Sequence, residues 1–306
     1  MKPERFREQG ALLLDVLPLI TAYPQFALKG GTAINLFAQN MPRLSIDIDL
    51  AYLPLESRDD TLENIHNLLQ NLAQDIKKRM ARVKIQEIQT LPQEQTKQLL
   101  CRTERVQIKI EVNTVIRGSL FPPKKRTLCE PAQKLFGRFV QITTLSTHDL
   151  YGGKICAALD RQHPRDLFDM HCFFRNTPDI DATLKKAVLF YLLSHNRPLS
   201  ELLDPNLKDL TYLYANSFAG MSDDPVSLND LLQTRTQLIN TLKKTLTAED
   251  KAFLLSFKQG TPSWHIAGMD VFENYPSIQW KLLNIKSMAP DKHTLAVKRL
   301  SIVLDQ

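Results

Sequence analysis

The sequence predicts an α+β protein, with strands and helices mixed in the first half and helices alone in the second. Residues 107–113 alternate between polar and apolar side chains, which is typical of a half-buried strand. Residues 61–83 repeat apolar side chains along one helical face. Beyond Ser146, leucine-rich segments with little strand character continue to the C-terminus. We therefore expect two domains, one over residues 1–176 and a helical one over residues 177–306.

The other elements follow from local patterns along the chain. An amphipathic helix is expected over about residues 3–21, followed by a short buried strand at 26–28. A glycine turn then leads into a helix over 32–39, which Pro42 ends because proline cannot continue a helix. Further strands are expected at 45–53, 83–88, 98–101 and 139–143, and a Pro- and Lys-rich loop at 122–126.

Composition narrows the class of protein. The chain has 306 residues, a net charge of +6 and a pI near 9.0, a balance that suits a polyanionic partner such as RNA or a nucleotide. Its four cysteines are scattered without a C-x-x-C pair and are interpreted as reduced thiols. Asp15 and Pro18 interrupt the early apolar run, so we expect neither a signal peptide nor a membrane span, and a cytoplasmic protein.

Two carboxylates stand close together near the start of the chain. Asp47 and Asp49 are two residues apart on an expected strand, so their side chains project from the same face while Ile48 and Leu50 face the core. Two adjacent negative charges favour a cation between them, and carboxylate oxygens are ligands that Mg²⁺ prefers. Such a metal would orient phosphates for an in-line displacement. The alternative is an exposed strand edge that carries two aspartates.

A glycine turn precedes this pair. Gly30 and Gly31 follow a strand and precede a helix, where glycine lets the backbone approach phosphate oxygens and the helix start offers N–H groups. Thr32 would add a hydroxyl or cap the helix. The segment lacks the G-K-[ST] of a Walker loop and the G-x-G-x-x-G of a dinucleotide fold. An ordinary tight turn is the alternative.

Glu111 is a third candidate carboxylate. It lies on the polar face of the strand expected at 105–113, and it would complete a triad with the two aspartates if the two strands are neighbours. It would then bind a metal or act as the base that activates the attacking hydroxyl. A solvated strand face beside Lys109 explains it equally well.

A second polar block lies further along the chain. Ser146 and Asp149 resemble a capping box at the start of a helix that carries Lys154, a residue able to reach a triphosphate as a point charge. Pro164 begins the next helix, on which Asp166 and Asp169 share a face and could orient Lys154 or Arg161 through ion pairs. A structural salt-bridge network between two helices is the alternative.

Together these segments resemble the AbiEii/AbiGii-type toxin family, minimal nucleotidyltransferases of type IV toxin–antitoxin systems. The first match is the turn at Gly30–Thr32 with the D-x-D of Asp47 and Asp49, as in the polymerase-β-like nucleotidyltransferase fold. The second resembles the family's K…R…R-D-x-x-D block and consists of Lys154, Arg161, Arg165, Asp166 and Asp169. The resemblance covers about residues 25–175 and implies a mixed sheet flanked by helices.

The resemblance also implies roles for single residues. Asp47 and Asp49 would hold Mg²⁺ or Mn²⁺, with Glu111 as a further candidate ligand. Lys154 would contact the triphosphate, and Asp169 would be the acidic partner in the second block. Arg165 and Asp166 would support these residues from behind. The expected nucleotide-binding residues are Lys29, Gly30, Gly31, Thr32, Ser45, Lys154 and Arg161.

The predicted reaction is the metal-dependent transfer of a nucleoside monophosphate from an NTP to a hydroxyl group of an acceptor molecule. The resemblance to the family suggests tRNA as this molecule, modified at its acceptor end. The helical half and the basic segment at 124–126 would bind the acceptor. The resemblance implies a cognate antitoxin encoded nearby, acting without direct contact in many relatives. Two other classes remain open: transfer of a phosphate or a nucleotide onto a protein, and a non-catalytic RNA-binding module.

Overall fold

The computed structural model describes residues 4–90, 95–177, 179–222 and 224–305. Backbone contacts divide the chain into two compact units, which are described one at a time. The first consists of Met1–Leu150 with Ala219–Pro225, and the second of Tyr151–Phe218 with Val226–Gln306. The domain boundary at 176/177 that the sequence suggests stays a prediction.

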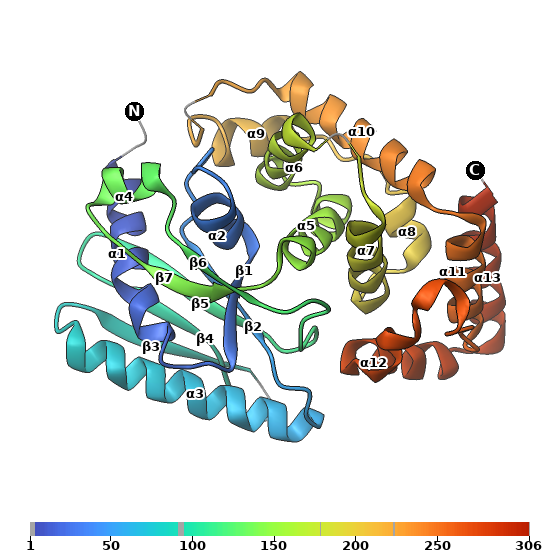
Figure 1. Cartoon of the computed structure of the whole chain (residues 1–306), viewed down its shortest axis with the longest axis horizontal. Helices are drawn as coiled ribbons and strands as arrows, with labels where there is room; N and C mark the ends of the chain where they lie inside the picture. The colour runs from blue at the N-terminus through green and yellow to red at the C-terminus, as the bar shows by residue number, and fades with distance from the viewer. Residues whose placement is uncertain (1–3, 91–94, 178, 223, 306) are drawn as a thin grey trace. The chain divides into compact units, whose positions relative to one another are not determined.

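A mixed seven-stranded sheet forms the centre of the first unit, in the order β3-β4-β5-β2-β1-β7-β6 (Figure 1). β2 pairs with β1 antiparallel and with β5 parallel, so it occupies the middle of the sheet. β1 also pairs with β7 in parallel, and the remaining neighbours are antiparallel. The strands are β1 (Phe26–Lys29), β2 (Asp47–Tyr52), β3 (Lys84–Thr90), β4 (Gln95–Arg102), β5 (Gln107–Asn113), β6 (Lys124–Thr127) and β7 (Gln141–Thr144).

Two long helices pack on this sheet. α1 (Glu4–Ile20) contacts β5 and β7, and α3 (Arg58–Arg79) contacts β3 and β4. α3 begins at Ser57, whose hydroxyl accepts a hydrogen bond from the Asp60 amide. Acidic residues in its first turn and basic residues in its last turn suit the helix dipole. Both helices bury the apolar stripes that the sequence predicts; Pro3, the expected start of α1, lies outside the described residues.

Three local features differ from the sequence prediction. The helix expected at 32–39 begins earlier, as α2 (Gly30–Ala33), and continues as the π-helical turn η1 (Ile34–Ala38). The loop expected at 122–126 is wrong for its second half, because Lys124–Thr127 forms the edge strand β6, paired with β7. Edge strands commonly carry lysine and have no alternating pattern to reveal them. A short helix, α4 (Glu130–Phe136), was not anticipated.

Helices make up the second unit, as the sequence predicts for this part of the chain. α5 (Thr147–Arg161) starts in the first unit, and its residues from Tyr151 onward belong to the second. α7 (Ala182–Ser194) is buried along most of its length and contributes to the core. The other elements are α6 (Pro164–Asn176), α8 (Leu199–Leu203), α9 (Thr211–Ser217), α10 (Leu228–Thr245), α11 (Ala248–Gln259), η2 (Ile266–Gly268), η3 (Asp270–Asn274), α12 (Pro276–Lys286) and α13 (Pro290–Asp305).

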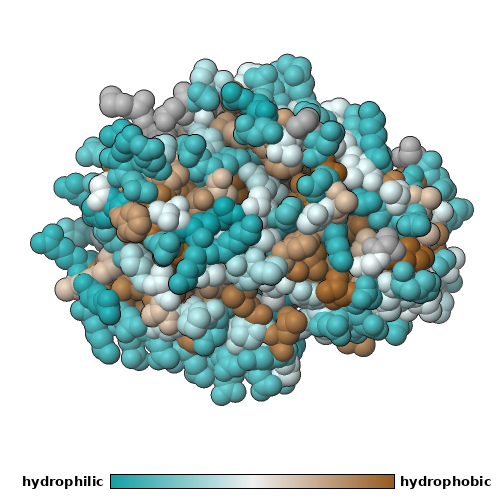
Figure 2. Space-filling model, in the orientation of Figure 1, coloured by the Kyte–Doolittle hydropathy of each residue, from teal (hydrophilic) through white to brown (hydrophobic). Residues whose placement is uncertain are grey.

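The surface in view is mainly hydrophilic, with apolar residues in separate patches (Figure 2). In the part of the chain that the structure describes, we find no helix with the length and apolar character needed to cross a membrane.

Candidate active site

The glycine turn joins the end of β1 to α2. Gly30 has a φ of +70°, a left-handed conformation that glycine adopts at little cost. A Cβ atom at Gly30 would collide with the Asp49 carboxylate. At Gly31 it would lie 2.9 Å from both Arg43 Nη2 and Ser45 Oγ. Gly30 therefore requires glycine, and a side chain at Gly31 would force Arg43 or Ser45 to shift.

Thr32 fixes the turn to the neighbouring strand. Its fully buried hydroxyl donates a hydrogen bond to the Asp47 carbonyl oxygen and lies 3.0 Å from the Ser45 hydroxyl. The sequence left open whether Thr32 adds a hydroxyl to the turn or caps the helix. α2 begins at Gly30 with Lys29 at the N-cap position, so Thr32 lies within the helix and does not cap its start. The Thr32 side chain is thus engaged in holding the turn against β2.

Asp47 and Asp49 project from one face of β2, while Ile48 and Leu50 on the opposite face are fully buried. Asp49 stands opposite Lys29 on β1 and Glu111 on β5 in the strand register. Burial raises the pKa of Asp49; Lys29 and Lys109 oppose this shift, whereas Asp47 and Glu111 add to it. An ionised Asp49 is therefore held under unfavourable electrostatics that a divalent cation would relieve.

Glu111 lies on the strand next to β2, which was the condition for a carboxylate triad. Its side chain, however, is half exposed and forms an ion pair with Lys109 on the same strand, with a distance of 2.6 Å between Lys109 Nζ and Glu111 Oε2. Lys109 in turn stands opposite Asp47 in the register. The polar face of the central strands therefore places Asp47 opposite Lys109 and Asp49 opposite Glu111, and Glu111 is paired with Lys109.

The carboxylates of Asp47 and Asp49 are ligands of the type that a divalent cation takes together with phosphates and water. Mg²⁺ commonly uses one or two protein carboxylates and takes its other ligands from phosphates and water. Over the residues that the structure describes, no group of three or more His, Cys, Asp and Glu side chains is arranged to hold a metal ion. A site on Asp47 and Asp49 would thus depend on the bound nucleotide for its remaining ligands.

The second block forms a buried ion cluster between α5 and α6, within the second unit. Lys154 Nζ lies 2.8 Å from Asp166 Oδ1 and 2.8 Å from Asp169 Oδ2. All three side chains are almost completely buried, with exposures of 6%, 5% and 0%. The sequence left open which cation the two aspartates orient, and both of them contact Lys154.

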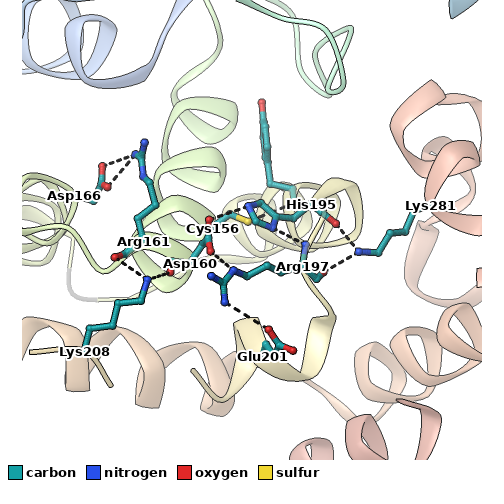
Figure 3. A network of polar contacts seen from close by, with 10 residues as sticks. Cys156, Asp160, Arg161, Asp166, His195, Arg197, Glu201, Lys208 and Lys281 are labelled. Carbon is teal, nitrogen blue, oxygen red and sulfur yellow. Dashed lines mark hydrogen bonds and ion pairs between the residues drawn. The ribbon is translucent and has the colours of Figure 1, made fainter. Parts of the chain in front are cut away.

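Arg161 joins this cluster from its exposed side. Its Nη2 lies 2.9 Å from Asp166 Oδ2, while 60% of its side chain is exposed (Figure 3). Burial raises the pKa of Asp166, but Lys154 and Arg161 more than offset it, so the pKa lies below its ordinary value. α6 starts beside the cluster at Pro164, where the His163 ring accepts a hydrogen bond from the Arg165 amide. Arg165 itself is half-buried in the first turn of α6.

The structure thus groups the predicted residues into two sets, one on each compact unit. The turn, Ser45, Asp47, Asp49 and Glu111 belong to the first set, and the ion cluster belongs to the second. Sequence reasoning missed two cations of the first set. Arg43 is a nearly buried arginine beside Gly31, a rare environment that follows only from folding. Lys109 was seen only as a neighbour of Glu111, and its place opposite Asp47 depends on strand pairing.

Comparison with known proteins identifies the class. The family model of the AbiEii nucleotidyl transferase toxins of type IV toxin–antitoxin systems matches residues 11–284. The chain therefore belongs to this family, and it is a nucleotidyltransferase.

Solved structures show the same fold. One similar structure is MenT4, a nucleotidyltransferase toxin from Mycobacterium tuberculosis H37Rv, with a TM-score of 0.59 and 16% sequence identity. The match covers 98% of this chain and 94% of that one. At this level of identity the likeness concerns the fold. No protein of curated function matches the sequence.

Proposed function

We propose that the enzyme uses Mg²⁺ or Mn²⁺ to transfer a nucleoside monophosphate from an NTP to a hydroxyl of an RNA, with the acceptor end of tRNA as the expected acceptor. The observation that carries this proposal is the glycine turn at Gly30–Thr32, which is bonded directly to the strand that presents Asp47 and Asp49. A phosphate-binding turn and a metal-binding pair on adjoining elements suit a metal-bound triphosphate.

Each residue of the first set has a role in the proposal. Asp47 and Asp49 hold the metal ion, which when bound supplies positive charge next to the phosphates. The backbone at Gly30 and Gly31 contacts the phosphates, and Arg43 adds a buried positive charge beside the turn. Lys29 balances the charge of Asp49, its register partner. Ser45 and Thr32 keep the turn at a fixed position on β2.

In the second set, Lys154 is proposed to contact the triphosphate, and Arg161 to contact the nucleotide from its exposed position. Asp166 and Asp169 fix the Lys154 side chain, since each lies 2.8 Å from its ammonium group. A charged side chain held in one position loses little further entropy when it meets a phosphate, which is how a positioned group contributes to phosphoryl transfer. Arg165 supports the first turn of α6.

Glu111 has two possible tasks within this proposal. It would act as a further metal ligand or as the base for the acceptor hydroxyl if it released Lys109. In its present contact it neutralises Lys109 instead. Of the two carboxylates that face each other across β2 and β5, Asp49 is the more buried and is assigned the metal.

The acceptor is proposed to be RNA because of charge. The chain carries a net charge of +6, and Lys124 and Lys125 are exposed on the edge strand β6. Phosphate contacts from exposed lysines supply affinity for RNA without reading sequence. We include in the proposal a cytoplasmic location, where NTPs and tRNA occur, and an antitoxin encoded nearby that acts without direct contact.

The proposal is tested by incubating purified enzyme and total RNA with each α-labelled NTP and Mg²⁺, then sizing the products. We expect one NTP to give a labelled band of tRNA size that RNase removes and protease leaves. A matched Asp47→Asn/Asp49→Asn variant should give no band. Label that protease removes and RNase leaves would contradict an RNA acceptor, and equal labelling by the variant would contradict the metal site.

A further inference from the structure

A pocket lies within the second unit, and its lining includes none of the residues assigned above. Its volume is about 500 Å³, within the range of small-molecule sites. The walls come from the end of α7, the start of α8, and the facing sides of α11 and α12. Those that matter for the argument are His195, Phe257, Lys258, Trp280 and Lys281.

Two lysines enter this pocket from different helices. Lys258 of α11 is only 9% exposed, and its ammonium group donates to the thioether sulfur of Met288 at 3.7 Å, a weak acceptor. Lys281 of α12 donates to the carbonyl oxygens of His195 and, at 2.8 Å, Arg197 (Figure 3). Among the described residues, no carboxylate forms an ion pair with either lysine.

The acidic residues closest to Lys281 in this network are engaged elsewhere. Asp160 pairs with Arg197 and lies 3.4 Å from the His195 ring, and Glu201 pairs with Arg197 at 3.5 Å (Figure 3). The two lysine charges are therefore not neutralised by the protein around them.

Burial and mutual repulsion both weigh on these charges. Burial and, to a smaller extent, the charge of Lys258 lower the pKa of Lys281 to about 8. Burial also lowers the pKa of Lys258. Buried charges in proteins are ordinarily paired, because an uncompensated one is costly. A pocket that gathers two such cations is therefore incomplete without an anion.

The remaining lining indicates what else the ligand carries. Phe257 and Ile285 give the pocket an apolar side, and Trp280 is a half-exposed aromatic side chain. The hydroxyls of Ser194 and Ser277, 2.9 Å apart, add polar groups to the lining. A ligand that fits has an anionic end and a flat or apolar body.

We propose that this pocket binds a phosphate monoester with a planar body, of the size of a nucleoside monophosphate, its phosphate lying between Lys258 and Lys281. An ammonium group has three donors. Lys281 uses two on carbonyl oxygens and Lys258 uses one on sulfur, so N–H donors of both remain for phosphate oxygens. A doubly charged phosphate matches two lysines better than a single carboxylate does. This site goes beyond the proposed transfer reaction and does not depend on it.

The test is calorimetric titration of the full-length protein with AMP, adenosine and inorganic phosphate in magnesium-free buffer. We expect AMP to bind at least about tenfold more tightly than adenosine, because the phosphate supplies charged hydrogen bonds. Inorganic phosphate should bind more weakly than AMP, because it lacks the planar body.

Two methionine variants make the test specific to the pocket. Lys258→Met should weaken AMP binding at least about tenfold, while its melting temperature stays the same or rises, since methionine buries no charge. Lys286→Met, an exposed lysine of α12 that does not line the pocket, should change AMP binding less than about twofold. Lys258→Gln serves as a second variant if methionine perturbs folding.

Three results would overturn the proposal. The first is the absence of AMP binding to the wild-type protein. The second is unchanged affinity and stoichiometry of AMP for Lys258→Met, which would put the ligand elsewhere. The third is adenosine binding as tight as that of AMP, which would show that the pocket recognises the planar body and not the phosphate.

Discussion

The Lys154 ammonium group lies 2.8 Å from the Asp169 carboxylate, and both side chains are buried in the second unit. The partly buried Asp49 of the first unit is in the opposite situation. Burial raises its pKa and Asp47 and Glu111 add to the shift, although Lys29 and Lys109 oppose it. In the second unit the negative charges of the aspartates are therefore balanced by Lys154 within the protein. In the first unit the ionised form of Asp49 is disfavoured, and a bound cation would stabilise it. This difference leads to predictions of opposite sign.

Asp49→Asn should abolish nucleotide transfer and still raise stability without metal. Because burial raises the pKa of Asp49, protonation favours the folded state; that contribution is present below about pH 4 and is lost as pH rises through the folded pKa. At pH 7.5 asparagine avoids the buried charge, so we expect the melting temperature to rise by roughly 2 °C or more. Thermal melts of variant and wild type without Mg²⁺ at pH 4 and 7.5 measure this difference. A melting temperature of the variant below that of the wild type at pH 7.5 would be evidence against it.

Asp166→Asn should destabilise the protein by about 3 kcal/mol at neutral pH, because it breaks a buried ion pair with Lys154. Burial raises the pKa of Asp166, but Lys154 and Arg161 bring it below its ordinary value. The stabilisation is thus complete above about pH 4 and disappears as pH falls through the lowered pKa.

The measurement is denaturant unfolding of wild type and variant between pH 3 and 7. Arg161→Gln is the matched control: its side chain is 60% exposed, so we expect a loss below about 1 kcal/mol. A difference between wild type and Asp166→Asn that grows as pH falls would show that the sign is wrong.

Gly30→Ala should reduce activity more than its effect on folding explains. At Gly30 the backbone has a positive φ, and an added Cβ would also collide with Asp49. At Gly137 the φ is +61°, but an added Cβ would have no atom within 4 Å. Both alanine variants should lose about 1 kcal/mol of stability from the left-handed backbone. Only Gly30→Ala should also lose nucleotide transfer, and equal activity of the two variants would remove the glycine turn from the site.

Glu111→Gln separates the two roles left to that residue. If Glu111 only neutralises Lys109, the Mg²⁺ concentration for half-maximal activity should change less than about threefold, since no metal ligand is lost. A shift of tenfold or more in that concentration would show that Glu111 binds the metal during the reaction.

Much of the fold could be predicted from local patterns. The alternation in β5 and the apolar stripe of α3 specify those elements, and the glycine turn and the D-x-D of β2 mark the first set of site residues. The edge strand β6 could not be recognised, because Lys124, Lys125 and Arg126 lack an apolar face. Short edge strands are specified by their partner, here β7, more than by their own sequence.

Strand neighbours were the main missing information at the site. Nothing in the local sequence requires β2 to lie between β1 and β5, so the positions of Lys29, Lys109 and Glu111 around the aspartates were only conditional. Likewise, the spacing of Asp166 and Asp169 put both on one helix face but left their partner undecided. Packing of α5 on α6 brings Lys154 to both.

In the proposed reaction, the α-phosphoryl group of the NTP moves with its nucleoside to the acceptor. Parallel incubations with α-labelled and γ-labelled NTP, enzyme, Mg²⁺ and total RNA measure this directly. We predict that label from the α position enters RNA, that label from the γ position leaves as pyrophosphate, and that Asp47→Asn/Asp49→Asn abolishes both. Acceptor labelled from the γ position alone would make the enzyme a phosphotransferase and would contradict this account.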